Sequence, residues 1–332
     1  MTTRLPVTDA SYVAGTRREV EARARAINLG PDEVARAALI ATELSTNLVR
    51  HGGGGEILVR PLPTPEVTGL ELIAIDRGPG IRDIGESLRD GISTRGTSGT
   101  GLGAIRRQAD EFDITSAPKQ GTAVLARVWP GRKPMAETGV QVGVVCVAKA
   151  GEEMCGDAWA VLPGHTTTAA LVADGLGHGP LASQASQEAR RLFMRGDTPS
   201  PNEAIRKIHA GLGATRGAAV AVASLDLAAN RVVFSGIGNI AGLVTAGGHT
   251  RRFVSMNGIA GHAAERFQEF IYPCEGPGLV LVLHSDGLST NWAFDRYTGL
   301  MARHPALIAS VLYRDAGRSR DDATVLVLKR AP

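Results

Sequence analysis

The sequence is poor in aromatic residues, in cysteine and in net charge. Only 4% of its 332 residues are Phe, Trp or Tyr, so its cores must consist mainly of Ala, Val, Leu and Ile. Its three cysteines (Cys146, Cys155 and Cys274) are odd in number and form no CxxC pair, which argues against a disulfide framework and against a zinc site. The net charge of +3 comes with no basic run carrying interleaved aromatics, so nucleic-acid binding is not expected.

Long apolar runs are also missing. The N-terminal stretch MTTRLPVTDASYVAGTRREV has no apolar segment of the kind found in signal peptides, and no run approaches the ~18–20 apolar residues of a membrane helix. We therefore expect a soluble, cytoplasmic protein without a membrane partner. The hydrophobic content of 43% is ample for packed cores, and the length suggests about two domains.

The first segment, which ends near Trp129, mixes helices and strands. Apolar residues at helical spacing predict helices over residues 19–27, 32–50 and 102–112. The runs EILVR and LELIAID read as strands, and FDITS with GTAVLARVW reads as a hairpin. Residues 87–101 are polar and glycine-rich, which predicts a loop or lid.

The stretch PGRKPMAETG (130–139) is the best linker candidate, because it combines two prolines, two glycines and mixed charge. After it, strand-like runs dominate, namely VQVGVVCVAKA, TAALVAD, GAAVAVASLD, RVVFSGIG, AGLVTA, GLVLVLHSD and ATVLVLK. Helices are predicted only near 182–195, 202–212 and 305–316. The second segment is therefore α+β, with two sheets or one large sheet covered by helices. We place the domains at 1–130 and 139–332, joined by a linker at 131–138.

One group of polar residues lies on the predicted helix at 32–50. Glu43, Asn47 and His51 are spaced by four, which keeps their side chains on one helix face. An acid, an amide and an imidazole can together position a hydroxyl and hold a hard cation through oxygen. A polar helix face is more often only a solvated one, so this group needs support from elsewhere in the chain.

That support comes from two glycine-rich stretches further along. DRGPG (Asp76–Gly80) follows a predicted strand, where an Asp can accept a hydrogen bond from the amino group of a base and glycines let a ring approach the backbone. GTSGTGLG (96–103) runs into a predicted helix, whose N-terminal amides suit phosphate. Each stretch alone is an ordinary turn or loop by composition, but their order on these elements favours a nucleotide site.

These residues resemble the GHKL ATP-binding fold, and most closely the anti-sigma-type serine kinases related to RsbT. ELSTNLVRHG is similar to their N-box, DRGPGI and GTGLGAIRR to their two glycine boxes, and QGTAV to the later Gly-Thr strand, over about 19–128. The resemblance implies that Glu43 is the general base for a substrate serine or threonine, that Asn47 holds Mg²⁺ and that Asp76 binds adenine. It also implies an ATP site lined by Gly78, Gly80, Gly99, Gly101, Gly103 and Thr122. His51 would orient Glu43, or serve only as a structural residue.

The second segment carries aspartates in turns at the ends of β-like runs. They are Asp157 in CGDAW, Asp174 in ADGLGHG, Asp286 in HSDGL, and Asp321 with Asp322 in RDDATVLVL. Any single Asp-Gly is usually just a turn, but four such turns can bring carboxylates together. Converging carboxylates repel one another, so the pattern makes sense around Mg²⁺ or Mn²⁺, which prefer oxygen ligands. Two such ions can activate a water for attack on phosphorus.

The set resembles the metal-dependent PPM-type serine/threonine phosphatases, in the bacterial branch of SpoIIE and RsbX. GDAW, DGLGHG, SGIGN, SDGL and DDATVL occur in the family's order across about 140–329. The resemblance implies that Asp157, Asp174, Asp286 and Asp321 bind two Mn²⁺ or Mg²⁺ ions, with Asp321 favoured over Asp322. Gly175 would contribute its backbone carbonyl, and we also expect it to need freedom in φ.

His178, in the same DGLGHG stretch, has two readings. An imidazole suits a general acid at neutral pH, so it could protonate the leaving serine oxygen. It could equally hydrogen-bond a ligand or the backbone of the turn.

The combined prediction is an α+β protein, with a GHKL ATP-binding α/β sandwich followed by a PPM-type α-β-β-α phosphatase sandwich. We expect a bifunctional regulator that phosphorylates and dephosphorylates serine or threonine on STAS-domain proteins of a partner-switching, stressosome-like or sigma-factor pathway. One alternative is a phosphatase whose N-terminal domain only senses ATP, although Glu43 argues against it. The other is a non-enzymatic module that sequesters a sigma factor or another partner.

Overall fold

The computed structural model describes residues 1–88, 101–132, 139–164, 166–195, 200–264, 266–318 and 320–331. These residues form two compact units, each described here by itself. The first unit combines Met1–Ala136 with the later segment Ala293–Arg314, and the second combines Glu137–Trp292 with Asp315–Pro332. The units are therefore defined by packing and not by chain order, and the domain boundaries predicted from the sequence remain a prediction.

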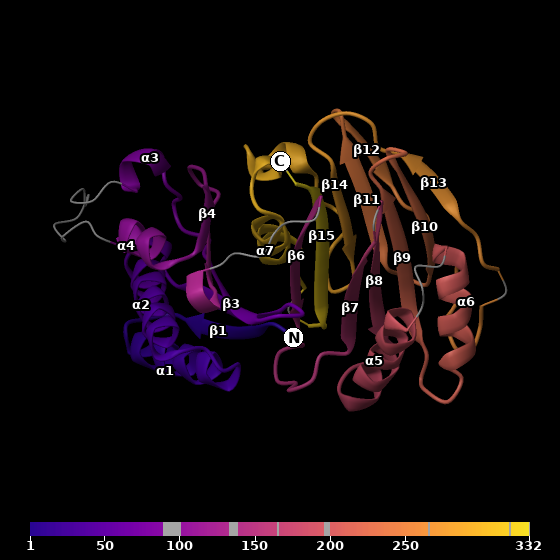
Figure 1. The fold of residues 1–332 in the computed structure, drawn as a ribbon, viewed down its shortest axis with the longest axis horizontal. Helices are drawn as coiled ribbons and strands as arrows, with labels where there is room; N and C mark the ends of the chain where they lie inside the picture. The colour runs from indigo at the N-terminus through magenta and orange to yellow at the C-terminus, as the bar shows by residue number, and fades with distance from the viewer. Residues whose placement is uncertain are drawn as a thin grey trace. The chain divides into compact units, whose positions relative to one another are not determined.

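The first unit is built on one antiparallel sheet of five strands in the order β1-β2-β3-β5-β4 (Figure 1). The strands are β1 (Thr3–Val7), β2 (Gly55–Pro63), β3 (Thr68–Ile75), β4 (Glu111–Ser116) and β5 (Thr122–Val128). The α-helices with residues in this unit are α1 (Ser11–Ala26), α2 (Pro31–Asn47), α3 (Ile84–Ser87), α4 (Gly101–Gln108) and α7 (Pro305–Ala316). Shorter helical turns lie at Leu48–Gly52, which is π-helical, and at Pro130–Arg132, Phe294–Arg296 and Leu300–Ala302.

The hydrophobic core of this unit lies between one face of the sheet and helices α1, α2 and α4. Alternate residues of β3, such as Leu70 and Leu72, point into it and meet Ile40 and Leu44 of α2. Helix α2 begins at Pro31, whose fixed φ suits the first turn, and apolar residues at helical spacing give it one buried face. Because one face of α2 packs against the sheet, its opposite, polar face points away from the core.

The structure of the first unit differs from the sequence-based prediction at three places. Helix α1 begins at Ser11 and not at residue 19, because the Asp9 carboxylate accepts hydrogen bonds from the backbone N–H and the hydroxyl of Ser11. Strand β1 was not expected, and it is defined by its pairing with β2. The helix predicted over 102–112 ends at Gln108, since Glu111 already belongs to β4.

The second unit contains two five-stranded antiparallel sheets, which decides between the two arrangements expected from the sequence. One sheet has the order β13-β10-β9-β8-β7 and the other β12-β11-β14-β15-β6. The strands are β6 (Val140–Val147), β7 (Asp157–Pro163), β8 (Thr167–Gly175), β9 (Ala218–Asp226), β10 (Arg231–Ile237), β11 (Ala241–Ala246), β12 (His249–Arg252), β13 (Phe270–Pro273), β14 (Val280–His284) and β15 (Ala323–Arg330). Strands β7, β12 and β13 were not expected.

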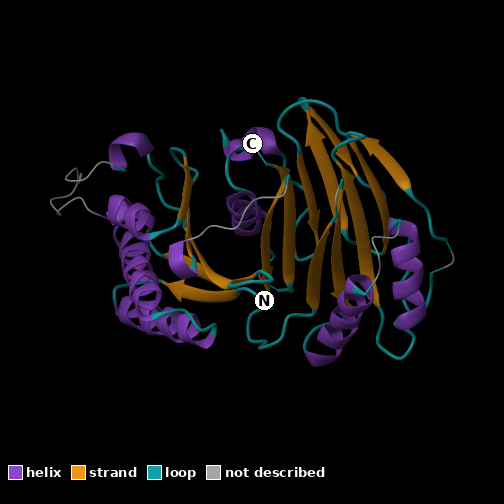
Figure 2. Ribbon diagram, in the orientation of Figure 1, coloured by secondary structure: helices purple, strands orange, loops and turns teal. Residues whose placement is uncertain are grey.

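The two sheets pack face to face through a core of small and branched apolar residues, including Val172, Leu281 and Leu326. Helices α5 (Pro180–Met194) and α6 (Pro201–Gly211) cover the outer face of the sheet that contains β8 (Figure 2). None of the helices in the described part of the chain has the length and apolar character of a membrane span. The turns that contain the predicted metal-binding aspartates lie at the ends of β7, β8, β14 and β15.

Candidate active sites

In the first unit, the C-terminal part of α2 and the start of α4 form a polar cradle. Glu43 and Asn47 lie one turn apart on α2, and both are half-buried. A Cβ added to Gly101, the first residue of α4, would lie 3.1 Å from Asn47 Oδ1 and 3.6 Å from Glu43 Oε2. Asn47 Nδ2 is buried and has no hydrogen-bond partner among the described residues. The unpartnered Nδ2–H group can donate to a phosphate oxygen, and the amide oxygen Oδ1 can bind a cation.

Asp76 is held at the end of β3 by backbone groups. Its Oδ1 accepts hydrogen bonds from the N–H groups of Gly78 (2.8 Å) and Thr122 (3.1 Å), and its own N–H donates to the carbonyl of Thr122 (3.0 Å). Burial raises the pKa of Asp76, and the two backbone hydrogen bonds act against that shift. With Oδ1 fixed in this way, Oδ2 is left to accept a hydrogen bond from a ligand.

The glycines near Asp76 permit close backbone approaches. Gly80 has φ of +73°, and a Cβ there would lie 2.0 Å from the carbonyl oxygen of Ala117. A Cβ on Gly78 would lie 2.9 Å from the Cα of Gly52, in the π-helical turn that follows α2. These approaches bring the end of β3 against the end of α2 and the turn before β5.

The remaining predicted nucleotide residues have different outcomes. Gly103 is buried within α4, whereas Gly99 and most of the expected lid lie outside the described residues. His51 is exposed and lowers the pKa of Asp76 through its charge, and its role towards Glu43 stays a prediction.

In the second unit, Asp157 and Asp174 are paired across β7 and β8. Asp157 Oδ2 accepts a hydrogen bond from the Ser285 hydroxyl at 2.6 Å, while its Oδ1 is buried with no partner in the described structure. Burial and the neighbouring Asp174 raise the pKa of Asp157 well above its ordinary value. A buried carboxylate oxygen facing a second carboxylate is a favourable environment for a divalent cation.

Asp174 lies at the centre of the group. Burial and the charges of Asp286 and Asp321 raise the pKa of Asp174 to about 8. Asp286 is itself fixed by Asn239, whose Nδ2 donates to its Oδ2 at 2.7 Å. The mutual repulsion shows that these carboxylates share one region, with Asp174 close to the others.

Asp321 and Asp322 differ in their contacts. Asp322 is buried, and its Oδ1 accepts a hydrogen bond from the backbone N–H of Lys149 at 2.9 Å, which ties it to the loop after β6. Asp321 is half-buried and acts electrostatically on Asp286. Asp322 Oδ2, like Asp157 Oδ1, is buried with no hydrogen-bond partner among the described residues, so the preference for Asp321 as the metal ligand stays a prediction.

The expectation that Gly175 needs φ freedom is wrong. Gly175 is not among the glycines with positive φ, and it forms part of β8. A Cβ at this position would instead lie 1.9 Å from the carbonyl oxygen of Ala182 in α5. Glycine is required because helix α5 passes directly over the strand end.

The acidic group has the donor chemistry of an Mg²⁺ or Mn²⁺ site, since all its side-chain donors are oxygens. Among the described residues, no three His, Cys, Asp or Glu side chains come close enough to hold one ion by themselves. A backbone carbonyl such as that of Gly175, together with water, would have to complete each site. The orphaned Asp157 Oδ1 nevertheless fits a bound cation.

His178 has an acidic partner that the sequence did not suggest. Its Nδ1 lies 2.8 Å from Oε1 of Glu152, and its side chain is largely exposed. Sequence reasoning also missed Asn239 and Ser285 as contacts of the aspartates, although both lie in the quoted SGIGN and HSDGL motifs.

Comparisons with known proteins match two parts of the chain to two different families. Residues 6–128 match the model of the histidine kinase-like ATPase domain, and residues 164–331 match the model of stage II sporulation protein E (SpoIIE). The serine/threonine-protein kinase RsbT of Bacillus subtilis (strain 168) is 36% identical over 106 residues, which cover 32% of this chain and 80% of RsbT.

Two solved structures resemble the chain in fold. A chain from the bacterial stressosome, described as a modular system adapted to control secondary messenger signaling, has a TM-score of 0.53 at 24% identity, covering 57% of this chain and all of that one. RsbX in complex with magnesium has a TM-score of 0.52 at 18% identity, covering 60% of this chain and 99% of RsbX. The chain therefore belongs to the SpoIIE family through residues 164–331 and carries, in residues 6–128, a histidine kinase-like ATPase domain related to RsbT.

Proposed function

We propose that the protein is a bifunctional partner-switching regulator. Its ATPase domain phosphorylates serine or threonine on a STAS-domain or stressosome-like protein with ATP, and its SpoIIE-family part removes such phosphates. The observation that carries the proposal is that each unit keeps its own set of acidic and amide groups. Glu43 and Asn47 lie beside Gly101 in one unit, and Asp174 lies among other carboxylates in the second.

For phosphorylation, Glu43 is the group that accepts the proton of the substrate hydroxyl. Asn47, with its unpartnered amide, would hold Mg²⁺ and a phosphate, and the ion would supply charge neutralisation of the transferring phosphoryl group. Asp76 would accept a hydrogen bond from the adenine amino group through Oδ2, because its Oδ1 is already held by backbone N–H groups. Similarity to RsbT, which is named a serine/threonine-protein kinase, supports catalysis over ATP sensing alone.

For dephosphorylation, Asp157, Asp174, Asp286 and Asp321 would hold two Mn²⁺ or Mg²⁺ ions, with the Gly175 carbonyl as a further ligand. Such ions supply Lewis-acid activation of water and neutralise phosphate charge. Asn239 fixes the orientation of Asp286, and Ser285 that of Asp157. His178, supported by Glu152, would donate the proton to the leaving serine or threonine oxygen.

The test is to incubate the purified protein with a STAS-domain protein encoded beside it, using ATP with Mg²⁺ and then Mn²⁺. We expect phosphate to be incorporated on serine or threonine and then released as inorganic phosphate. ATP binding without transfer would favour the sensor alternative, and stoichiometric capture of a partner without turnover would favour the sequestering one.

A further inference from the structure

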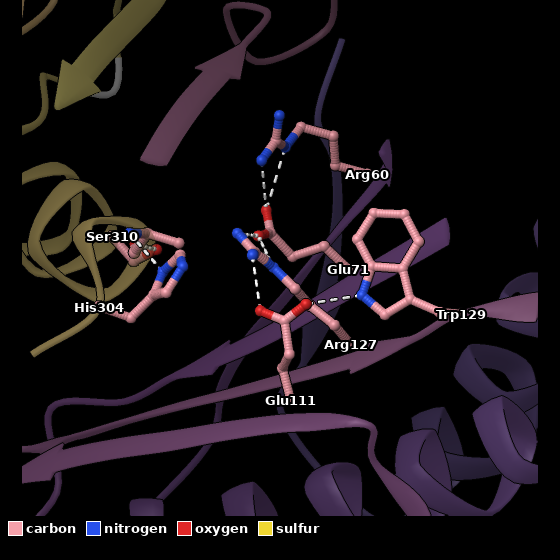
Figure 3. A network of polar contacts seen from close by, with 8 residues as sticks. Arg60, Glu71, Glu111, Arg127, Trp129, His304 and Ser310 are labelled. Atoms are coloured by element: carbon pink, nitrogen blue, oxygen red, sulfur yellow. Dashed lines mark hydrogen bonds and ion pairs between the residues drawn. The ribbon is translucent and has the colours of Figure 1, made fainter. Parts of the chain in front are cut away.

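The face of the first sheet that points away from α1 and α2 carries a row of charged residues. The strand register places Arg60 of β2, Glu71 of β3, Arg127 of β5 and Glu111 of β4 side by side on it. Ion pairs of 2.8, 2.7 and 2.9 Å join them in that order (Figure 3). Glu71 is only 1% exposed, so something must cover this face.

The segment Ala293–Arg314 covers this face. It lies within the SpoIIE-family match (164–331) but packs in the first unit. Figure 3 shows His304 and Ser310 of this segment beside the charged row. The Asp113 carboxylate accepts a hydrogen bond from the backbone N–H of His304 at 2.7 Å, and Arg4 donates to the Tyr313 hydroxyl at 3.4 Å. The strand register puts Asp113 and Arg4 on the same face as Glu71.

At its C-terminal end the segment reaches the backbone of the nucleotide site. Arg314 Nη1 donates to the backbone carbonyl of Asp76 at 2.9 Å, and a Cβ on Gly121 would lie only 2.8 Å from the same nitrogen. In return, the guanidinium of Arg77 donates to the backbone carbonyl of Arg314. Arg314 is 8% exposed, whereas Arg77 is exposed and Asp76 half-buried, so these contacts are partly buried.

We infer that Arg314 is a positioning residue for Asp76, so that the nucleotide site of the ATPase domain is completed by a residue from the SpoIIE-family part of the chain. The inference rests on the proposed binding of ATP at Asp76. Asp76 discriminates between bases only if its carboxylate is fixed, and Arg314 fixes the backbone from which that carboxylate projects. Without Arg314, the partly buried carbonyl of Asp76 loses this donor and the strand end can shift.

The experiment measures equilibrium binding of ATP and GTP to the full chain carrying Arg314→Met, Arg314→Lys or Arg303→Met. Arg303 is the matched control, because it pairs with Asp113 on the same segment but away from Asp76. We expect Arg314→Met to weaken ATP binding about tenfold and GTP binding less, which lowers the ATP/GTP preference. Arg314→Lys should restore part of that preference, and Arg303→Met should preserve it.

Two results would overturn the inference while leaving the proposed function intact. One is wild-type ATP binding in Arg314→Met, and the other is an equal loss for ATP and GTP that Arg314→Lys does not restore, which indicates general destabilisation. Absence of ATP binding in the wild-type chain would instead overturn the proposed kinase function, and the inference with it.

Discussion

Asp157 and Asp174 face each other across β7 and β8, although seventeen positions separate them in the sequence. Asp157 is 1% exposed, and burial together with the charge of Asp174 raises the pKa of Asp157 well above its ordinary value. A divalent cation bound between the two carboxylates would relieve their repulsion. The pairing therefore predicts a divalent-cation site at this end of the hairpin.

Replacing Asp174 tests the metal site. We expect Asp174→Asn to lower dephosphorylation by more than about 100-fold, since loss of supporting contacts alone costs 10–100-fold at metal sites. Thermal unfolding followed during Mn²⁺ titration should show stabilisation of the wild-type chain and little for the variant. Retention of Mn²⁺-dependent stabilisation would argue against Asp174 as a shared ligand.

The two activities should be separable by single substitutions. Glu43→Ala should reduce phosphorylation of the STAS-domain substrate by about 10²–10⁴-fold, the usual contribution of a general base, and leave dephosphorylation unchanged. Asp286→Ala should do the reverse, because its carboxylate acts only in the second unit. Radiolabelled phosphate on and off the same substrate measures both, and loss of both activities in either variant would contradict separate sites.

Gly101 offers a substitution that blocks the nucleotide without weakening the helix. Alanine is favoured within helices, but its methyl group would lie 3.1 Å from Asn47 Oδ1. We expect Gly101→Ala to weaken ATP binding about tenfold or more, because the methyl group crowds Asn47 and removes one polar contact with the nucleotide. The unfolding temperature should not fall. Gly15→Ala in α1 is the control, since nothing lies within 4 Å of its Cβ. Equal ATP affinity in both variants would sink this prediction.

The charged row under residues 293–314 should make the first unit sensitive to acid. Burial acts to raise the pKa of Glu71, but Arg60 and Arg127 overcome it and lower the pKa from 4.5 to about 2. Because the folded-state pKa is the lower one, the ionised pair stabilises the fold above pH 4.5, and this contribution is lost as the pH falls towards 2. The shift corresponds to about 3 kcal/mol.

Glu71→Gln should therefore cost about 3–5 kcal/mol near pH 7, because it leaves two buried guanidinium groups without their carboxylate. Hydrogen exchange of the β3 amides measures this locally. The difference between wild type and variant should shrink between pH 4.5 and 3, and a constant difference would show that Glu71 does not carry the pH dependence.

Local patterns predicted many of the elements, because they depend on residues close in sequence. Helix α7 begins and ends where its apolar spacing indicates, and α2 begins within one residue of the expected position. Strands β1 and β7 were missed, since a short strand is defined by the neighbour it pairs with. The start of α1 was missed because Asp9 initiates it through contacts that no periodicity reveals.

By itself, the sequence determined the two families and the candidate residues, since glycine-rich turns and Asp-bearing strand ends are written in consecutive residues. Only the tertiary structure decided that Asp157 faces Asp174, that Asp322 is tied to Lys149, and that Gly175 serves a close helix approach. It also decided that Arg314 supports Asp76 across 238 positions. Strand register and the burial of a charged sheet face bring together residues that are distant in the sequence. Because these residues share no local pattern, the sequence alone does not reveal their contacts.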